Sequence, residues 1–161
     1  MKGIVYQLNR KPEIQGERGL PKLAIASAHI SYQGVKGDYN HYRKKWKFNT
    51  SSRALLIYPK EMYQQLQIEG WPANPGDLGE NITTEEIPCE SFLLESIWNI
   101  GEVQIKISEP CKPCKVLGLL EYIGEKRKVE FVKTLVNRRG WYARVLKEGI
   151  INKKDIIERI S

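Results

Sequence analysis

The sequence has few cysteines and histidines and contains no long hydrophobic run. Only three cysteines and two histidines occur among its 161 residues. A small, odd number of cysteines is unlike the paired set of a disulfide-stapled secreted protein and favours a reducing compartment. No stretch of about 18 apolar residues is present, and residues 1–10 lack the apolar segment of a signal peptide. We therefore expect a cytoplasmic protein that has no membrane partner.

Internal repeats, Gly/Ser-rich linkers, a dinucleotide-binding glycine fingerprint and a P-loop are also absent from the sequence. The composition, with 41% hydrophobic and 28% charged residues, is typical of a globular protein. We therefore expect one domain over residues 1–161. The net charge of +7 suggests an anionic partner. The basic residues are scattered in short clusters, such as residues 43–45, and none lies in a nucleic-acid motif, so we expect no nucleic-acid partner.

Several segments have the hydrophobic period of a β-strand. Val103, Ile105 and Ile107 alternate with polar residues, which predicts a strand with one buried face. Further strands are expected at residues 4–8, 23–30, 54–58 and 141–145.

Helices are expected in fewer places. One would begin at Pro59 and end at Gly70, because proline suits a first helical turn and glycine a C-terminus. Others are expected over residues 115–122 and 129–139, and residues 153–160 fit either a helix or a terminal strand. The pattern predicts an α+β domain that is mainly β, with a barrel as one arrangement of its strands. Its long loops at 9–21, 33–52 and 71–80 would lie on one rim and be functional.

Cys111 and Cys114 form a C-x-x-C pair, which is compatible with four kinds of site. A zinc site needs more ligands than the pair supplies, and the two histidines lack metal-ligand spacing. A thioredoxin-type redox pair normally follows a βαβ pattern that is not seen here. The cysteines could also be small packing residues, although the flanking Pro110 and Pro113 stiffen the loop more than packing requires.

The fourth possibility is a single reactive thiolate at Cys114. Backbone N–H groups at the start of a following helix would stabilise its negative charge. Lys112 and Lys115 add positive charge nearby. The local residues favour this possibility without excluding the other three.

Several segments together resemble the MOSC domain, a family named after the C-terminal domain of molybdenum-cofactor sulfurases and linked to pyridoxal-phosphate enzymes. The resemblance covers nearly the whole chain, and the small stand-alone bacterial members are the most similar type. Its most specific parts are Gly-Glu-Asn at residues 79–81 and Pro-Cys at residues 113–114. The order and spacing of further segments also match: 16–22, 34–40, 53–58, 75–84, 101–108 and 139–146.

The resemblance implies a MOSC-type β-barrel-like α+β domain with a few short helices. It also implies that Cys114 is the characteristic catalytic residue, either as a ligand to the metal of a pterin-bound molybdenum cofactor or as a persulfide carrier. The first role implies an oxidoreductase that reduces N-hydroxylated compounds with electrons from a separate reductase. The second implies a sulfurtransferase that receives sulfur from a cysteine desulfurase for cofactor or metal–sulfur assembly.

A bound molybdenum cofactor needs donors for its phosphate and polar groups along its pterin edge. Polar side chains in the matching segments are the candidate contacts, although each could equally be a surface charge or a turn residue: Lys22, Asp38, Asn40, Arg53, Asn81 and Arg139. The family often has arginine three residues before the characteristic cysteine, where this chain has Cys111. The change either removes a basic contact or supplies a resolving thiol for Cys114.

Overall fold

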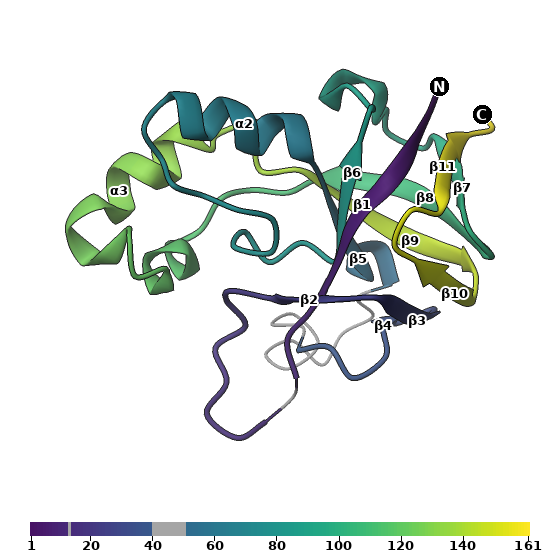
Figure 1. The fold of residues 1–161 in the computed structure, drawn as a ribbon, viewed down its shortest axis with the longest axis horizontal. Helices are drawn as coiled ribbons and strands as arrows, with labels where there is room; N and C mark the ends of the chain where they lie inside the picture. Colours follow the sequence, from purple (N-terminus) through teal and green to yellow (C-terminus); the bar gives the residue numbers. More distant parts are fainter. Residues whose placement is uncertain (13, 40–50) are drawn as a thin grey trace.

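The computed structural model describes residues 1–12, 14–39 and 51–161. The candidate contact Asn40 and the basic cluster at 43–45 lie outside the described residues. Seven of the eight strands of the main sheet close into a barrel, because β11 pairs with both β7 and β1 (Figure 1). Around the barrel the strands run β1 (Lys2–Arg10), β11 (Ile156–Arg159), β7 (Ile97–Ile100), β8 (Val103–Pro110), β9 (Trp141–Lys147), β5 (Leu55–Pro59) and β6 (Ile82–Glu85).

Strand pairing around the barrel is antiparallel except between β5 and β6, which are parallel. The eighth strand, β2 (Leu23–Ile25), extends the sheet from β1. A small second sheet contains β3 (Ser27–Ser31), β4 (Gly34–Val35) and β10 (Gly149–Asn152). The strand expected at 23–30 is therefore two strands with a bend between them, and each joins a different sheet. The ambiguous tail forms a strand, β11.

The barrel interior is the larger of two hydrophobic cores. Val103, Ile105 and Ile107 of β8 are buried in it, while the intervening residues are partly exposed, as their period predicts. Phe92 and Trp98 fill the interior as well, with ring centroids 4.8 Å apart. The expected mainly β, barrel-like fold with a few short helices is confirmed.

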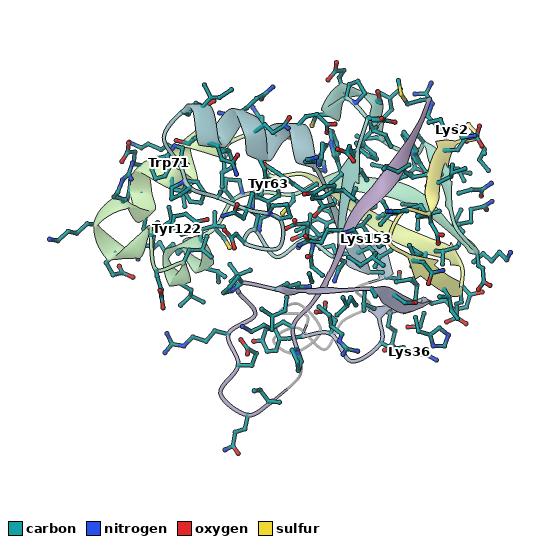
Figure 2. All side chains as sticks on the ribbon, viewed as in Figure 1. Lys2, Lys36, Tyr63, Trp71, Tyr122 and Lys153 are labelled. Carbon is teal, nitrogen blue, oxygen red and sulfur yellow. The ribbon has the colours of Figure 1, made fainter. Side chains whose placement is uncertain are left out.

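The second core lies beside the barrel, under α2 (Lys60–Ile68) and α3 (Gly124–Thr134). Trp71 packs on Phe131 there, with ring centroids 4.7 Å apart. Figure 2 shows Trp71, Tyr63 and Tyr122 on this helical side of the molecule. Helix α2 follows Pro59 and ends before Gly70, as predicted. No helix among the described residues is long and apolar enough to cross a membrane.

Two predicted helices differ from those observed. Helix α3 ends at Thr134 rather than near Arg139, and Val129 and Val136 are exposed. The helix also begins at Gly124 rather than at residue 129. Phe131 and the C-cap residue Leu135 lie four residues apart and are both buried, whereas Val129 lies on another face and Val136 lies beyond the end of the helix. Instead of an α-helix over 115–122, the chain forms the short 3-10 helix η3 (Lys115–Leu119). An α-helix dipole behind Cys114 is therefore not available to activate the thiol.

The long loops meet at one rim of the barrel, as predicted for their described parts. The N–H of Lys22 donates to the carbonyl of Gly76 at 2.9 Å, which joins the first loop to the third. Gly76 has a φ of +96°, and a Cβ atom there would lie 2.4 Å from the Lys22 carbonyl oxygen. Only glycine allows both the conformation and the close approach.

Candidate functional site

A pocket opens at this rim, beside the end of β8. Five of the predicted site residues line it: Lys22, Arg53, Asn81, Cys114 and Arg139. Lys22 and Asn81 directly follow the first and third loops, and the others come from the 3-10 helix η1 (Ser51–Arg53), from the cysteine loop and from the segment before β9. Asp38 lies behind the pocket wall, in contact with Lys22 and Asn81. Distant parts of the sequence therefore form one site.

The two cysteines of the pair occupy different depths of the pocket. Cys114 is exposed and Cys111 is 5% exposed, and both are free thiols. The N–H of Cys111 donates to the carbonyl of Gly140 at 2.8 Å, and its side chain packs with Leu56 and Tyr142. Cys114 immediately precedes η3, and its side chain makes no capping hydrogen bond. Cys111 is thus fixed in the wall, whereas Cys114 is the accessible thiol.

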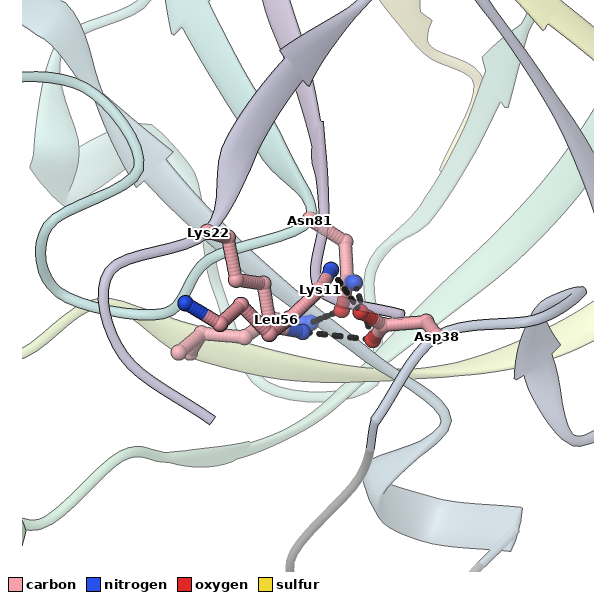
Figure 3. Close-up of polar contacts among 5 residues, drawn as sticks. All are labelled: Lys11, Lys22, Asp38, Leu56 and Asn81. Atoms are coloured by element: carbon pink, nitrogen blue, oxygen red, sulfur yellow. Dashed lines mark hydrogen bonds and ion pairs between the residues drawn. The ribbon is translucent and has the colours of Figure 1, made fainter. Parts of the chain in front are cut away.

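A buried ion-paired cluster supports the part of the pocket wall that Lys22 and Asn81 form (Figure 3). Lys22 Nζ lies 2.5 Å from Asp38 Oδ2, and the same oxygen accepts a hydrogen bond from Asn81 Nδ2 at 2.9 Å. The other Asp38 oxygen accepts the N–H of Lys11 at 2.8 Å. Asn81 Oδ1 accepts the N–H of Leu56 at 3.2 Å. The cluster joins the first and second loops to β5, so Asp38 has a positioning role here and its predicted cofactor contact stays a prediction.

Arg139 is the most unusual side chain of the site. It is only 7% exposed, and its Nη2 donates to the carbonyl of Leu78. Within the described part of the chain, its Nε and Nη1 atoms have no hydrogen-bond partner. Burial is the largest single influence on the pKa of Arg139 and lowers it. Neighbouring groups, including Cys111 and Tyr142, together outweigh burial, so the net pKa is raised and the guanidinium stays charged. Among the described residues, two nitrogens of this buried, pocket-lining cation are therefore unpaired.

Arg53 is paired at the pocket rim. Its Nε and Nη2 atoms each donate to the Glu109 carboxylate at 2.9 Å, and its guanidinium lies 5.3 Å from the centroid of the Tyr142 ring. The hydrogen bonds from Arg53 lower the pKa of Glu109. The Arg53 charge is thus largely balanced by Glu109, whereas none of the ion pairs among described residues involves Arg139.

Glu80 supports the site but was not among the predicted residues. Its buried carboxylate accepts hydrogen bonds from Gly76 N–H and Thr83 Oγ1, each at 2.7 Å, and from Tyr63 Oη at 2.8 Å. Burial raises the pKa of Glu80. These bonds hold the loop that presents the Leu78 carbonyl and Asn81. The Gly-Glu-Asn signature at residues 79–81 was the available sequence signal for this role.

Other pocket residues that were not candidate contacts are Arg18, Tyr39 and Tyr142, and Lys112 was expected only as a positive charge near Cys114. Most lie in segments that carried the family resemblance, but their types alone did not distinguish them from surface residues. Cys89, the third cysteine, lines a separate cavity with Trp141. Three or more histidine, cysteine, aspartate or glutamate side chains do not gather as a metal-binding cluster among the residues described.

Comparison with known proteins identifies the family of this chain. The model of the MOSC domain matches residues 37–158. Protein YflK of Bacillus subtilis is 27% identical over 152 residues, which cover 90% of this chain and 64% of the relative. A protein of Gibberella moniliformis named reductase is 29% identical over 116 residues, which cover 69% of this chain and 20% of that protein. The chain thus spans less than two thirds of the length of either relative.

A solved structure has the same fold. The crystal structure of the YUAD protein from Bacillus subtilis superposes with a TM-score of 0.80 at 18% sequence identity, covering 98% of this chain and 94% of that one. The family match extends from the second loop to β11 and so includes Arg53, Asn81, Cys114 and Arg139. The chain belongs to the MOSC domain family.

Proposed function

We propose that this protein binds the molybdenum cofactor in the pocket, with Cys114 as the molybdenum ligand, and that it reduces N-hydroxylated compounds. One observation carries the proposal: the same pocket is lined by an accessible thiol and by a buried guanidinium that has two nitrogens without a partner in the described part of the chain. A thiolate is a suitable ligand for a soft metal. A buried cation with unpaired donors is costly unless an anion pairs with it.

The residues fit a cofactor of this kind. The molybdenum cofactor carries an anionic phosphate and sulfur ligands, and an anion would pair with Arg139, whose Nε and Nη1 have no hydrogen-bond partner among the described residues. When bound, the cofactor would supply a redox centre that can remove oxygen from a substrate. Asn81 and Lys22 also line the pocket, where they are candidates for polar contacts with the pterin or phosphate. Arg18 and Lys112 add positive charge along its lining.

The chain's own residues would hold and orient these groups. Cys111, anchored to Gly140, fixes the start of the loop that carries Cys114. The Arg53–Glu109 pair holds the end of β8 against η1. The Lys22–Asp38 pair and Glu80 fix the other wall. A wall held by buried ion pairs and hydrogen bonds is preorganised for its ligand, which reduces the ordering cost of binding.

A second candidate function is sulfur transfer, and the second thiol in the pocket favours it. Cys114 would carry a persulfide received from a cysteine desulfurase and pass the sulfur to an acceptor in cofactor or metal–sulfur assembly. This function needs the same accessible thiol but no turnover of an N-hydroxylated compound. The relative named reductase supports the first function, although the chain covers only 20% of its length.

Reduction of an N-hydroxylated purine tests the proposal. The protein is purified from cells that make molybdenum cofactor and is supplied with a chemically reduced viologen dye in place of a reductase. We expect the wild type and the control Cys89→Ser to be active and Cys114→Ser to be inactive. Equal activity in Cys114→Ser refutes the proposal. Absence of turnover together with a persulfide on Cys114 supports sulfur transfer instead.

A further inference from the structure

Cys111 is a second thiol in the same pocket, but its surroundings differ from those of Cys114. Its side chain is 5% exposed, and its sulfur lies 3.7 Å from the Lys112 carbonyl oxygen. The hydrogen bond from its N–H to Gly140 fixes its backbone at the start of β9. Cys111 packs with Leu56 and Tyr142 and also lines the pocket with Cys114 and Arg139.

Arg139 gives Cys111 a cationic neighbour. The residue directly before Gly140 is Arg139, so the bond that anchors Cys111 also holds the two side chains in one wall. Two nitrogens of this buried guanidinium have no partner in the described part of the structure. The same wall therefore holds a basic side chain and a thiol.

We propose that Cys111 is a resolving thiol, which attacks a persulfide on Cys114 and releases its outer sulfur as hydrosulfide. This inference rests on Cys114 being the reactive thiol of the proposed function. The bond between Cys114 Sγ and the outer sulfur breaks, and a bond between Cys111 Sγ and Cys114 Sγ forms. The outer sulfur gains the two electrons that the cysteine sulfurs lose. The proton of the Cys111 thiol passes to the outer sulfur of the deprotonated persulfide, which leaves as hydrosulfide.

The chain between the two thiols can accommodate this reaction. Lys112 and Pro113 lie outside any strand, between the end of β8 and the start of η3. Cys111 is anchored, while the exposed Cys114 side chain makes no capping hydrogen bond and can move toward it. The sulfur donor is a persulfide or polysulfide, so no other oxidant is needed. A thiol reductant then restores the two thiols.

Mass spectrometry of sulfur-loaded protein tests the inference. The full chain, made in cells without molybdenum cofactor, is reduced, incubated with inorganic polysulfide, desalted, alkylated and weighed intact and as peptides. In the wild type we expect a Cys111–Cys114 disulfide, about 2 Da lighter than the reduced chain, and release of hydrosulfide. In Cys111→Ser we expect a sulfur adduct of about 32 Da on Cys114, which persists at least about tenfold longer.

Matched variants separate this reaction from general effects on the fold. Cys89→Ser should behave like the wild type, and Cys114→Ser should form no disulfide with Cys111. Cys111→Ala guards against a local effect of serine at a buried position, and thermal melting shows whether each variant is folded. An adduct with the same lifetime with and without Cys111, or no adduct on Cys114 in any variant, overturns the inference. Failure of the cofactor proposal would instead appear as wild-type protein without molybdenum and pterin.

Discussion

The Asp38 carboxylate and the Lys22 ammonium lie 2.5 Å apart inside the protein, with side chains 3% and 7% exposed. Asn81 donates to the same carboxylate, so three segments distant in sequence depend on one acidic group. Removing one partner of a buried pair leaves an uncompensated charge, which is much costlier than losing a surface pair.

We therefore expect Asp38→Asn to lower the free energy of unfolding by about 3–5 kcal/mol. Lys106 and Glu95 provide the control, since they are 2.6 Å apart but Glu95 is 71% exposed. Glu95→Gln should change the free energy of unfolding by about 0–1 kcal/mol. Urea unfolding of both variants measures the difference, and equally small losses would show that burial does not set the strength of this pair.

Two glutamates should give opposite pH dependence of stability. The raised pKa of Glu80 means that the folded state keeps a proton that the unfolded state has lost. Between the ordinary glutamate pKa of about 4.3 and this raised pKa, stability falls as pH rises. The lowered pKa of Glu109, due to Arg53, has the reverse effect: its stabilisation is lost as pH falls from about 4.3 through the lowered value.

Unfolding free energies of Glu80→Gln and Glu109→Gln, measured against the wild type from acid to neutral pH, test these signs. Relative to each variant, the wild type should lose stability with rising pH in the first comparison and gain it in the second. The same slope in both comparisons would contradict the assigned environments.

Arg139 should matter for anion binding more than for the stability of the ligand-free protein. Its buried guanidinium makes one hydrogen bond to the protein and leaves two nitrogens unpaired among the described residues. We expect Arg139→Met to leave the free energy of unfolding within about 1 kcal/mol of the wild type, or to raise it, and to lose bound cofactor.

The neighbouring Arg138 is the matched control, since it pairs with Glu69 near the surface at 2.8 and 2.9 Å. Arg138→Met should cost at most about 1 kcal/mol and keep the cofactor. Denaturant unfolding and pterin content measure the two effects. A loss of several kcal/mol in Arg139→Met with full cofactor retention would show that the guanidinium serves the fold instead.

Thiol alkylation should follow the exposure of the three cysteines. Cys114 is exposed, Cys89 is partly buried and Cys111 is buried. Burial also raises the pKa of the Cys89 thiol, which reduces its thiolate fraction. Under native conditions, iodoacetamide should modify Cys114 first and Cys111 last, as followed by peptide mass spectrometry. Faster modification of Cys89 than of Cys114 would argue against an accessible Cys114.

The sequence predicted strands in which buried and exposed residues alternate. Alternation at Val103, Ile105 and Ile107 identified β8, because one face of that strand fills the barrel. The bounds of α3 were missed because the predicted apolar stripe included Val129 and Val136. Both are exposed, so their hydrophobicity marked neither the buried face nor the end of the helix. The 3-10 form of η3 was missed too, since residues 115–122 contain no feature that separates it from a short α-helix.

The sequence named candidate site residues singly and not as a network. Lys22, Arg53, Asn81, Cys114 and Arg139 do line one pocket. Contacts between segments far apart in sequence pair Asp38 with Lys22 and Glu109 with Arg53. The same arrangement buries Arg139 and leaves two of its nitrogens without a partner among the described residues. Such contacts follow from the closed barrel and have no local signature. The Gly-Glu-Asn signature marked the segment of Glu80, but it did not indicate the hydrogen bonds that Glu80 makes.

The most direct test of the central claim is the molybdenum and pterin content per chain after purification from cells that make the cofactor. Wild type, Cys114→Ser, Arg139→Met and the control Cys89→Ser are compared. The account predicts molybdenum and pterin in the wild type and in Cys89→Ser, loss of molybdenum in Cys114→Ser, and loss of both in Arg139→Met. A wild type empty of both, even after incubation with free cofactor, would contradict it.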